Sequence, residues 1–155
     1  GVELLGTAVV NAQMVIEIAK VYGVQLTRAR AKELALSVGK TITGLGLVQG
    51  GLTLVSTSLA MSLPGLVVGR AVQSVTAAWL TRLAGASFIT YFKQDQDWGD
   101  GGMQEVVQRQ YDIDRREESL RKFIDKALER IVEPLKRNQR RQLPPRQRPR
   151  GEVES

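Results

Sequence analysis

The stretch TITGLGLVQGGLTLVSTSLAMSL, residues 41–63, decides the fold of this chain. It lies in a longer run that carries no charged residue between Lys40 and Arg70. Of its 23 residues, 11 are Ala, Val, Ile, Leu or Met and four are Gly. A segment of about 20 helical residues can cross the hydrocarbon core of a bilayer, and only a helix satisfies its own backbone groups there. We therefore expect a helix at residues 41–63, placed either in lipid or in a protein core.

Glycines recur at a regular spacing in and after this stretch. Gly46 and Gly50 form one GxxxG pair, and Gly65 and Gly69 form another just after Pro64. Small residues four apart allow two helices to approach closely, as they do in membranes. We predict that these four glycines are helix-packing positions. The alternative is a buried hairpin in a soluble bundle, with glycines at helix crossings and Ser/Thr hydroxyls bonded to the preceding turn.

The second arm of the hairpin, residues 65–92, carries Arg70 and Arg82 with only 11 residues between them. Spanning a bilayer would bury one of these cations, which costs roughly 2.5–3.5 kcal/mol on insertion scales. The sequence therefore disfavours a hairpin that crosses the membrane twice. A hairpin partly embedded in the interface, or one packed in a bundle that touches a membrane, remains compatible with it.

The rest of the chain also has the periodicity of helices and lacks the alternating pattern of strands. Thr27 is the expected N-cap of one helix, and Gly23 the expected end of the helix before it. Asp114 and Glu117 predict the start of the last helix. Trp98 is expected to pack on the bundle, with an interfacial anchor as the alternative. Further helices are expected at residues 2–22, 28–38 and 103–111, and the last one is expected from Asp114 to residue 135. The expected core residues include Ile16, Ile18, Leu34, Leu45, Leu52, Val72, Phe88, Phe123 and Ile131.

The predicted fold is an all-α helical bundle built around the hydrophobic, Gly-rich hairpin. Its helical domain covers residues 1–135, and residues 136–155 form a disordered tail rich in Arg and Pro. Residues 1–133 hold 15 Lys/Arg and 14 Asp/Glu, whereas residues 134–155 hold seven Lys/Arg and two Glu. The tail is therefore the basic part of the chain. The arginines expected to contact a membrane or an anion are Arg137, Arg140, Arg141, Arg146, Arg148 and Arg150.

No catalytic, cofactor-binding or metal-ligating residue is assigned. The chain has no Cys and no His, which excludes disulfides, His-based triads and the usual zinc ligands. Residues 39–41 spell GKT, but a phosphate-binding loop needs glycine where Leu34 stands. A calcium loop beginning at Asp95 would need Gly at position 100 and Glu at position 106, which hold Asp and Val. We expect no enzyme activity and no cofactor in this fragment.

Several motifs together resemble the YcjF-like domain of unknown function. They are IAKVYGV at residues 18–24, the Gly/Leu-rich run ending near residue 65, GRA at residues 69–71, and Gly85 with Phe88, Tyr91 and Phe92. The stretch QDWGDGG, residues 96–102, is similar to the cyanobacterial type of this domain. The resemblance implies a helical domain associated with bacterial inner membranes, often following an Era-like GTPase domain. It implies a GTP-binding domain upstream of Gly1, and it transfers no functional residue.

These observations predict a non-catalytic helical module, membrane-associated or regulatory, that forms the C-terminal part of a GTPase-linked protein. Its expected location is the cytoplasmic face of the inner membrane or the cytoplasm. The expected partners are a membrane surface or bilayer and the upstream GTPase domain. The alternative is a soluble helical domain that binds a protein partner through the stripe at residues 120–135. RNA association through the basic tail is a third reading; without aromatic residues to stack bases, sequence-specific binding is not expected.

Overall fold

The computed structural model describes residues 10–62, 69–134 and 137. In this part of the chain there are six α-helices and no strand, so the predicted all-α class is confirmed. A single turn of π-helix, η1, follows the last of them. The elements are α2 (Ala12–Val21), α3 (Arg28–Gly44), α4 (Leu47–Ser62), α5 (Gly69–Lys93), α6 (Gly102–Asp114), α7 (Glu117–Ala127) and η1 (Leu128–Val132).

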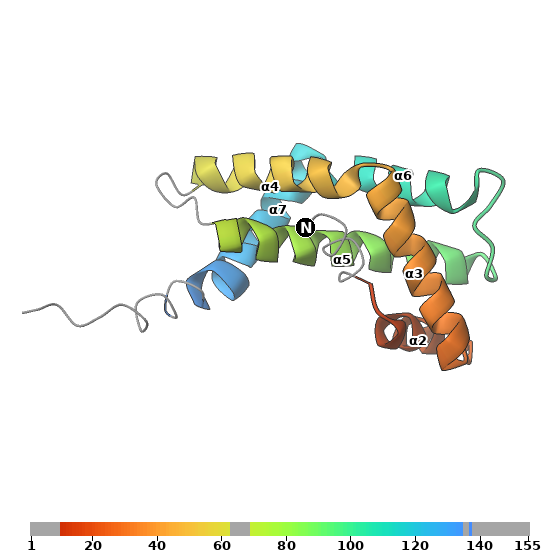
Figure 1. Cartoon of the computed structure of the whole chain (residues 1–155). Coiled ribbons are helices and arrows are strands. Elements are labelled where there is room, and N and C mark those ends of the chain that lie inside the picture. The colour runs from red at the N-terminus through yellow and green to blue at the C-terminus, as the bar shows by residue number, and fades with distance from the viewer. Residues whose placement is uncertain (1–9, 63–68, 135–136, 138–155) are drawn as a thin grey trace, which may run out of the picture.

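Helix α5 lies at the centre of the bundle and contacts α2, α4, α6, α7 and η1. Figure 1 shows α4 and α6 following one another along one side of α5, while α3 crosses steeply from α2 to the start of α4. This arrangement buries α5 on several sides. Its buried residues recur at four-residue spacing, as at Ala71, Val75, Trp79 and Leu83, so the buried band winds around the helix and meets different partners along its length.

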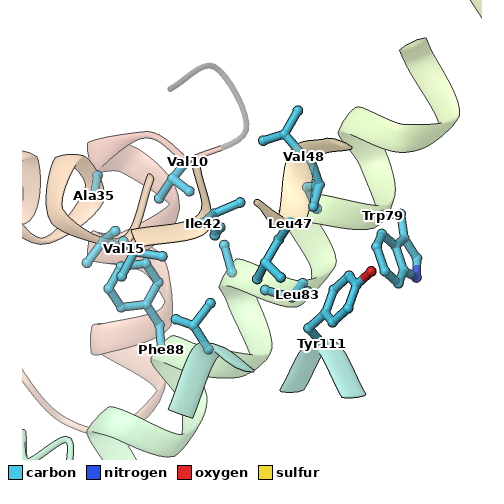
Figure 2. Close-up of a cluster of buried hydrophobic side chains, with 14 of the residues drawn as sticks. Val10, Val15, Ala35, Ile42, Leu47, Val48, Trp79, Leu83, Phe88 and Tyr111 are labelled. Atoms are coloured by element: carbon cyan, nitrogen blue, oxygen red, sulfur yellow. The ribbon is translucent and has the colours of Figure 1, made fainter. Parts of the chain in front are cut away.

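The core is assembled from side chains of all six described helices, five of which Figure 2 shows through Val15, Ile42, Val48, Trp79 and Tyr111. Of the residues predicted for the core, Leu34 and Phe88 are fully buried. A second group is partly buried and packs against the core: Ile16, Ile18, Leu45, Leu52, Val72 and Phe123. The side chain of Ile131 lies outside the described part.

The ends of α2 and α3 follow the expected chemistry. At the C-terminus of α2, Gly23 has φ +73°, and its N–H donates to Lys20 O at 3.0 Å. Val24 N donates to Ala19 O at 2.9 Å, which completes the predicted glycine cap. At the start of α3, the Thr27 hydroxyl accepts from Arg30 N at 3.2 Å, so the predicted N-cap is confirmed.

The expected single helix over residues 41–63 is not formed. Instead, α3 continues through Lys40 to Gly44, and α4 begins at Leu47 after a bend of 67°. Gly46 adopts φ +74° and donates its N–H to Thr43 O at 3.0 Å. That left-handed conformation ends α3 in the way glycine commonly ends helices. The uncharged stretch is therefore divided between the end of α3 and α4.

Two further features concern the C-terminal half. Trp98 stacks on Tyr91 with ring centroids 4.4 Å apart and lies 6.0 Å from Phe88, so it packs on the bundle as predicted.

Asp114 does not begin the last helix, because it is the final residue of α6; α7 starts at Glu117, after Arg116. The apolar stripe of α7 packs inward, with Leu120, Ile124 and Ala127 buried. The tail proposed at residues 136–155 lies outside the described residues except for Arg137.

Candidate functional site: the uncharged helix α4 and its surroundings

Helix α4 presents an exposed face without charge. Its buried stripe runs along Leu47, Val48, Val55 and Leu59, at helical spacing, with Gly51 on the same side. The opposite face exposes Gln49, Thr53, Thr57, Ala60 and Met61. Met61, at the end of the helix, is 79% exposed. Three of these five residues are polar but uncharged, so the face carries hydrogen-bonding groups and no charge, and only its last turn, at Ala60 and Met61, is apolar.

The glycines predicted as helix-packing positions have different surroundings. A Cβ placed on Gly50 would meet the hydroxyl of Tyr111, on α6, and lie 3.3 Å from Tyr111 Cζ. Nothing lies within 4 Å of a Cβ at Gly46 or at Gly69, and Gly65 falls outside the described residues. Gly46 therefore serves the bend rather than a close approach of helices. Of this set, the described structure places Gly50 alone at a close contact.

Sequence reasoning missed a second close contact, at Gly51. A Cβ there would lie 3.2 Å from Trp79 Cζ3 and 3.4 Å from Thr76 Cγ2, both on α5. Trp79 and Tyr111 pack edge to face with centroids 5.6 Å apart. The adjacent pair Gly50-Gly51 thus faces two helices at once, α6 and α5. In the sequence, the adjacent glycines Gly50 and Gly51, rather than the four-residue GxxxG spacing, mark the close helix contacts.

A small groove separates α4 from α7. Its volume is about 180 Å³, and Leu120 and Ile124 of α7 contribute apolar lining. Ser58 and Met61 line the α4 side, and the charged groups around it belong to Glu117, Arg121 and Asp125. The carboxylate of Glu117 pairs with Arg121 at 2.8 Å. The groove can therefore receive one medium-sized apolar side chain.

The GKT sequence has the backbone of a helix interior. Gly39, Lys40 and Thr41 all lie within α3, and Gly39 is buried. The Thr41 hydroxyl donates to Ser37 O at 2.8 Å and lies 3.2 Å from Met103 Sδ. Amides committed to helical bonds cannot form the cradle of converging N–H groups that holds a phosphate. Among residues 10–62, 69–134 and 137, no group of three or more Asp, Glu, His or Cys is placed to hold a metal ion.

In the described part, no single helix is both long enough and apolar enough to cross a membrane. The pair α3 and α4 passes the same test of length and composition when taken together, but it is bent by 67°. By that test the bent pair could be a broken span or a re-entrant segment.

The basic residues proposed for membrane or anion contact lie almost wholly beyond the described chain. Arg137 is exposed, and the others lie outside it: Arg140, Arg141, Arg146, Arg148 and Arg150.

A buried carboxyl group at the end of α6 was not anticipated. Asp114 is 8% exposed, and its Oδ1 accepts a hydrogen bond from Gln110 Nε2 at 2.9 Å. Burial raises the pKa of the Asp114 carboxyl, against the opposing effects of the Gln110 hydrogen bond and the Arg82 charge. The sequence did indicate this burial, because Val107, Tyr111 and Asp114 follow one another at i, i+4 and i+7 on one helix face.

A comparison with protein families matched residues 1–116 to the domain of unknown function DUF697. Searches of curated proteins and of solved structures gave no match.

Proposed function

We propose that the chain, which belongs to the DUF697 family of domains of unknown function, is a non-catalytic helical module. Its proposed role is to attach a larger protein to a membrane surface. The observation that carries the proposal is the uncharged, exposed face of α4, which ends at the exposed side chain of Met61. After the apolar end of this face, the sequence continues without charge as LPGLVV at residues 63–68.

The physical argument rests on what a bilayer interface accepts. An interfacial segment buries apolar side chains below the headgroups and keeps charges in water. A face without Lys, Glu, Asp or Arg avoids the large cost of desolvating a charge, while the Gln and Thr side chains of α4 keep their hydrogen bonds at headgroup level. At 1.5 Å per residue, the 16-residue helix α4 is roughly 24 Å long. That is shorter than the hydrocarbon core of about 30 Å. The arrangement therefore favours association with one leaflet over a complete span.

The basic tail supports the same proposal through charge. Residues 134–155 carry seven Lys/Arg against two Glu. Each cation near an anionic surface contributes about 1 kcal/mol, and this attraction weakens with salt. Insertion of the end of α4 at Met61 and electrostatic attraction by the tail are then two separable parts of one attachment.

The test is flotation with vesicles that contain an anionic lipid, compared with vesicles of a zwitterionic lipid alone. We expect binding to the anionic vesicles, and we expect Met61→Glu to weaken it several-fold, because a carboxylate cannot enter the interface. The matched control is Val21→Glu, since Val21 is also 79% exposed but ends α2, away from α4. Equal binding by the two variants would show that α4 takes no part in the attachment. Absence of binding to either vesicle would remove the proposed function.

Within the proposed function, the resemblance to the YcjF-like domain, of cyanobacterial type, supports a finer statement. The parent protein would carry a GTPase domain, located at the cytoplasmic face of the inner membrane or in the cytoplasm. The helical module would then relate the nucleotide state to the membrane. The measurement is GTP hydrolysis by the parent protein with and without anionic vesicles; rates that do not differ would separate a pure anchor from a regulatory module.

A second candidate function, the docking of a protein partner, is favoured by the groove between α4 and α7. The apolar stripe of α7 is used in the bundle, so the partner would reach only the edge of that stripe at Leu120 and Ile124. Weak, sequence-independent RNA association through the tail is a third candidate. The third candidate would be favoured if the protein does not bind anionic vesicles but binds RNA in a salt-sensitive way.

A further inference from the structure

Asp114 holds an oxygen atom that the fold leaves unpaired. Its Oδ1 is bonded to Gln110, whereas its Oδ2 is buried and has no hydrogen-bond partner in the described part of the molecule. Buried polar atoms are paired in the great majority of native structures, and an unpaired one destabilises the arrangement that buries it. The exception therefore needs a physical explanation.

The position of Asp114 adds a second penalty on its ionised form. It is the last residue of α6, where the helix dipole places negative partial charge on the terminal carbonyl groups. A carboxylate at this end is repelled, whereas the neutral acid is not. Burial and the dipole thus disfavour the same charged state.

The charge that acts on Asp114 from a neighbouring helix is Arg82 of α5. No ion pair joins these two residues in the described structure, because the Arg82 guanidinium lies over the ring of Phe123, with Cζ 5.9 Å from its centroid. Phe123 belongs to α7. The carboxylates in the first turn of α7 are exposed and pair within their own helix, Glu117 with Arg121 and Glu118 with Lys122. Arg82 is therefore shared between a ring on α7 and a carboxyl group on α6.

Helix α7 follows the buried carboxyl group closely in the chain. Only Arg115 and Arg116 separate Asp114 from the start of α7. The last turn of α6 is closed by Arg115 N, which donates to Tyr111 O at 2.9 Å, so the link to α7 begins at the residue next to Asp114. Detachment of α7 would remove Phe123 from Arg82.

From this geometry we propose that α7 is a releasable helix, and that the Asp114 carboxylate sets how readily it detaches. In the docked arrangement the carboxylate is buried with one oxygen unpaired, and Arg82 is held by Phe123. In the detached arrangement Oδ2 meets water and the guanidinium can turn to the carboxylate. The ionised form therefore favours detachment, and the neutral form favours docking. Protonation of Asp114 is then the switch between the two.

Hydrogen exchange of the α7 amides tests this inference on the complete chain. Asp114→Asn keeps the shape and the Oδ1 acceptor and removes the charge, although its amide N–H groups take the unpaired position of Oδ2. Because burying a charge costs more than burying a neutral amide, we expect α7 protection to rise roughly 10-fold near neutral pH. The matched control is Asp112→Asn, because Asp112 accepts from Gln108 at 3.2 Å in the same i,i+4 arrangement on the exposed face. We expect no change in that control. A rise of equal size in α3 would report a global effect and overturn the inference.

The pH dependence gives a second readout. After correction for intrinsic exchange, α7 protection in the original protein should fall several-fold as the pH is raised from about 4 and Asp114 ionises. In the Asp114→Asn protein it should be nearly flat. The same slope in both proteins would overturn the inference.

A third variant, Phe123→Leu, needs no Asp114→Asn protein for its first readout: unchanged α7 protection in Phe123→Leu alone would overturn the inference. Phe123→Leu preserves an apolar side chain but removes the ring that holds Arg82, so α7 protection should fall several-fold. In a protein that also carries Asp114→Asn, the effect of Phe123→Leu should be markedly smaller, because the carboxylate is no longer there to receive Arg82. Additive effects of the two substitutions would show that the two residues are not coupled, and would overturn the inference.

Discussion

The hydroxyl of Tyr111 on α6 lies directly against the backbone of Gly50 on α4, in the space that a Cβ at position 50 would occupy. Tyr111 is 6% exposed and packs edge to face on Trp79, so its ring has little room to withdraw. This contact fixes the distance between two helices that belong to different parts of the chain. It depends on the absence of a single methyl group.

Gly50→Ala should therefore destabilise the protein by about 1–3 kcal/mol, as overpacking of a tight contact does. Gly44→Ala is the control, because a Cβ at Gly44 meets nothing within 4 Å, and alanine should be neutral or stabilising there. Unfolding in urea measures both. Adding Tyr111→Phe to Gly50→Ala removes the colliding oxygen and should restore part of the loss. If the double variant is no more stable than Gly50→Ala alone, the collision is not the cause.

Gly46 should be intolerant of alanine for a different reason. Its φ of +74° is unfavourable for residues with a Cβ by roughly 1 kcal/mol, although the space around it is open. Gly46→Ala should therefore lower the free energy of unfolding by about that amount. Gly46→Asn should lower it less, because asparagine tolerates the left-handed region. Equal losses for alanine and asparagine would indicate that side-chain size, rather than backbone conformation, decides the outcome.

Replacing Asp95 or Gln96 with glycine should stabilise the protein. They adopt φ of +60° and +61°, so two consecutive residues with side chains are left-handed at the end of α5. There the N–H groups of Gln96 and Asp97 donate to Tyr91 O at 3.0 and 3.3 Å. Asp95→Gly should stabilise the protein by up to about 1 kcal/mol in thermal unfolding. Asp97→Gly is the contrasting variant, because it loses the bond from Gly99 N to Asp97 Oδ1 and should destabilise.

The stability difference between the original protein and Asp114→Asn should depend on pH. The pKa of Asp114 is raised in the folded state, so its neutral form favours the fold in acid, and that contribution is lost as pH rises through the raised pKa. Asp114→Asn should therefore gain relative stability from about pH 4 towards neutral pH. Urea unfolding of both proteins across this range measures the difference, in which the other carboxylates cancel. A difference that stays constant would contradict the raised pKa.

The sequence was sufficient for features that depend on neighbouring residues. The glycine cap at Gly23, the N-cap at Thr27 and the packing of Trp98 all follow from local chemistry, and the structure has them. The all-α class follows from periodicity in the same way. These features require no knowledge of which helices become neighbours.

The break at Gly46 and the contact at Gly50 depend on tertiary packing. Gly46 and Gly50 have the same spacing whether both face a partner helix or one of them ends a helix. The choice is made by α5 and α6, which place Trp79 and Tyr111 against the start of α4. Asp114 was misassigned for a similar reason. An Asp followed three residues later by Glu is a good helix start, but α6 continued to it and buried its side chain.

The central place of α5 has a consequence for the order in which the bundle assembles. Helices α4 and α6 precede and follow α5 along the chain, so each can pair with it after closing only a short loop. Helix α2 also contacts α5, but Val21 and Gly69 are separated by α3 and α4. Because the entropy lost on closing a loop grows with its length, the contact between α2 and α5 should form late on the folding pathway. Substitutions in α2 should then mainly accelerate unfolding, whereas substitutions between α4 and α5 should mainly slow folding.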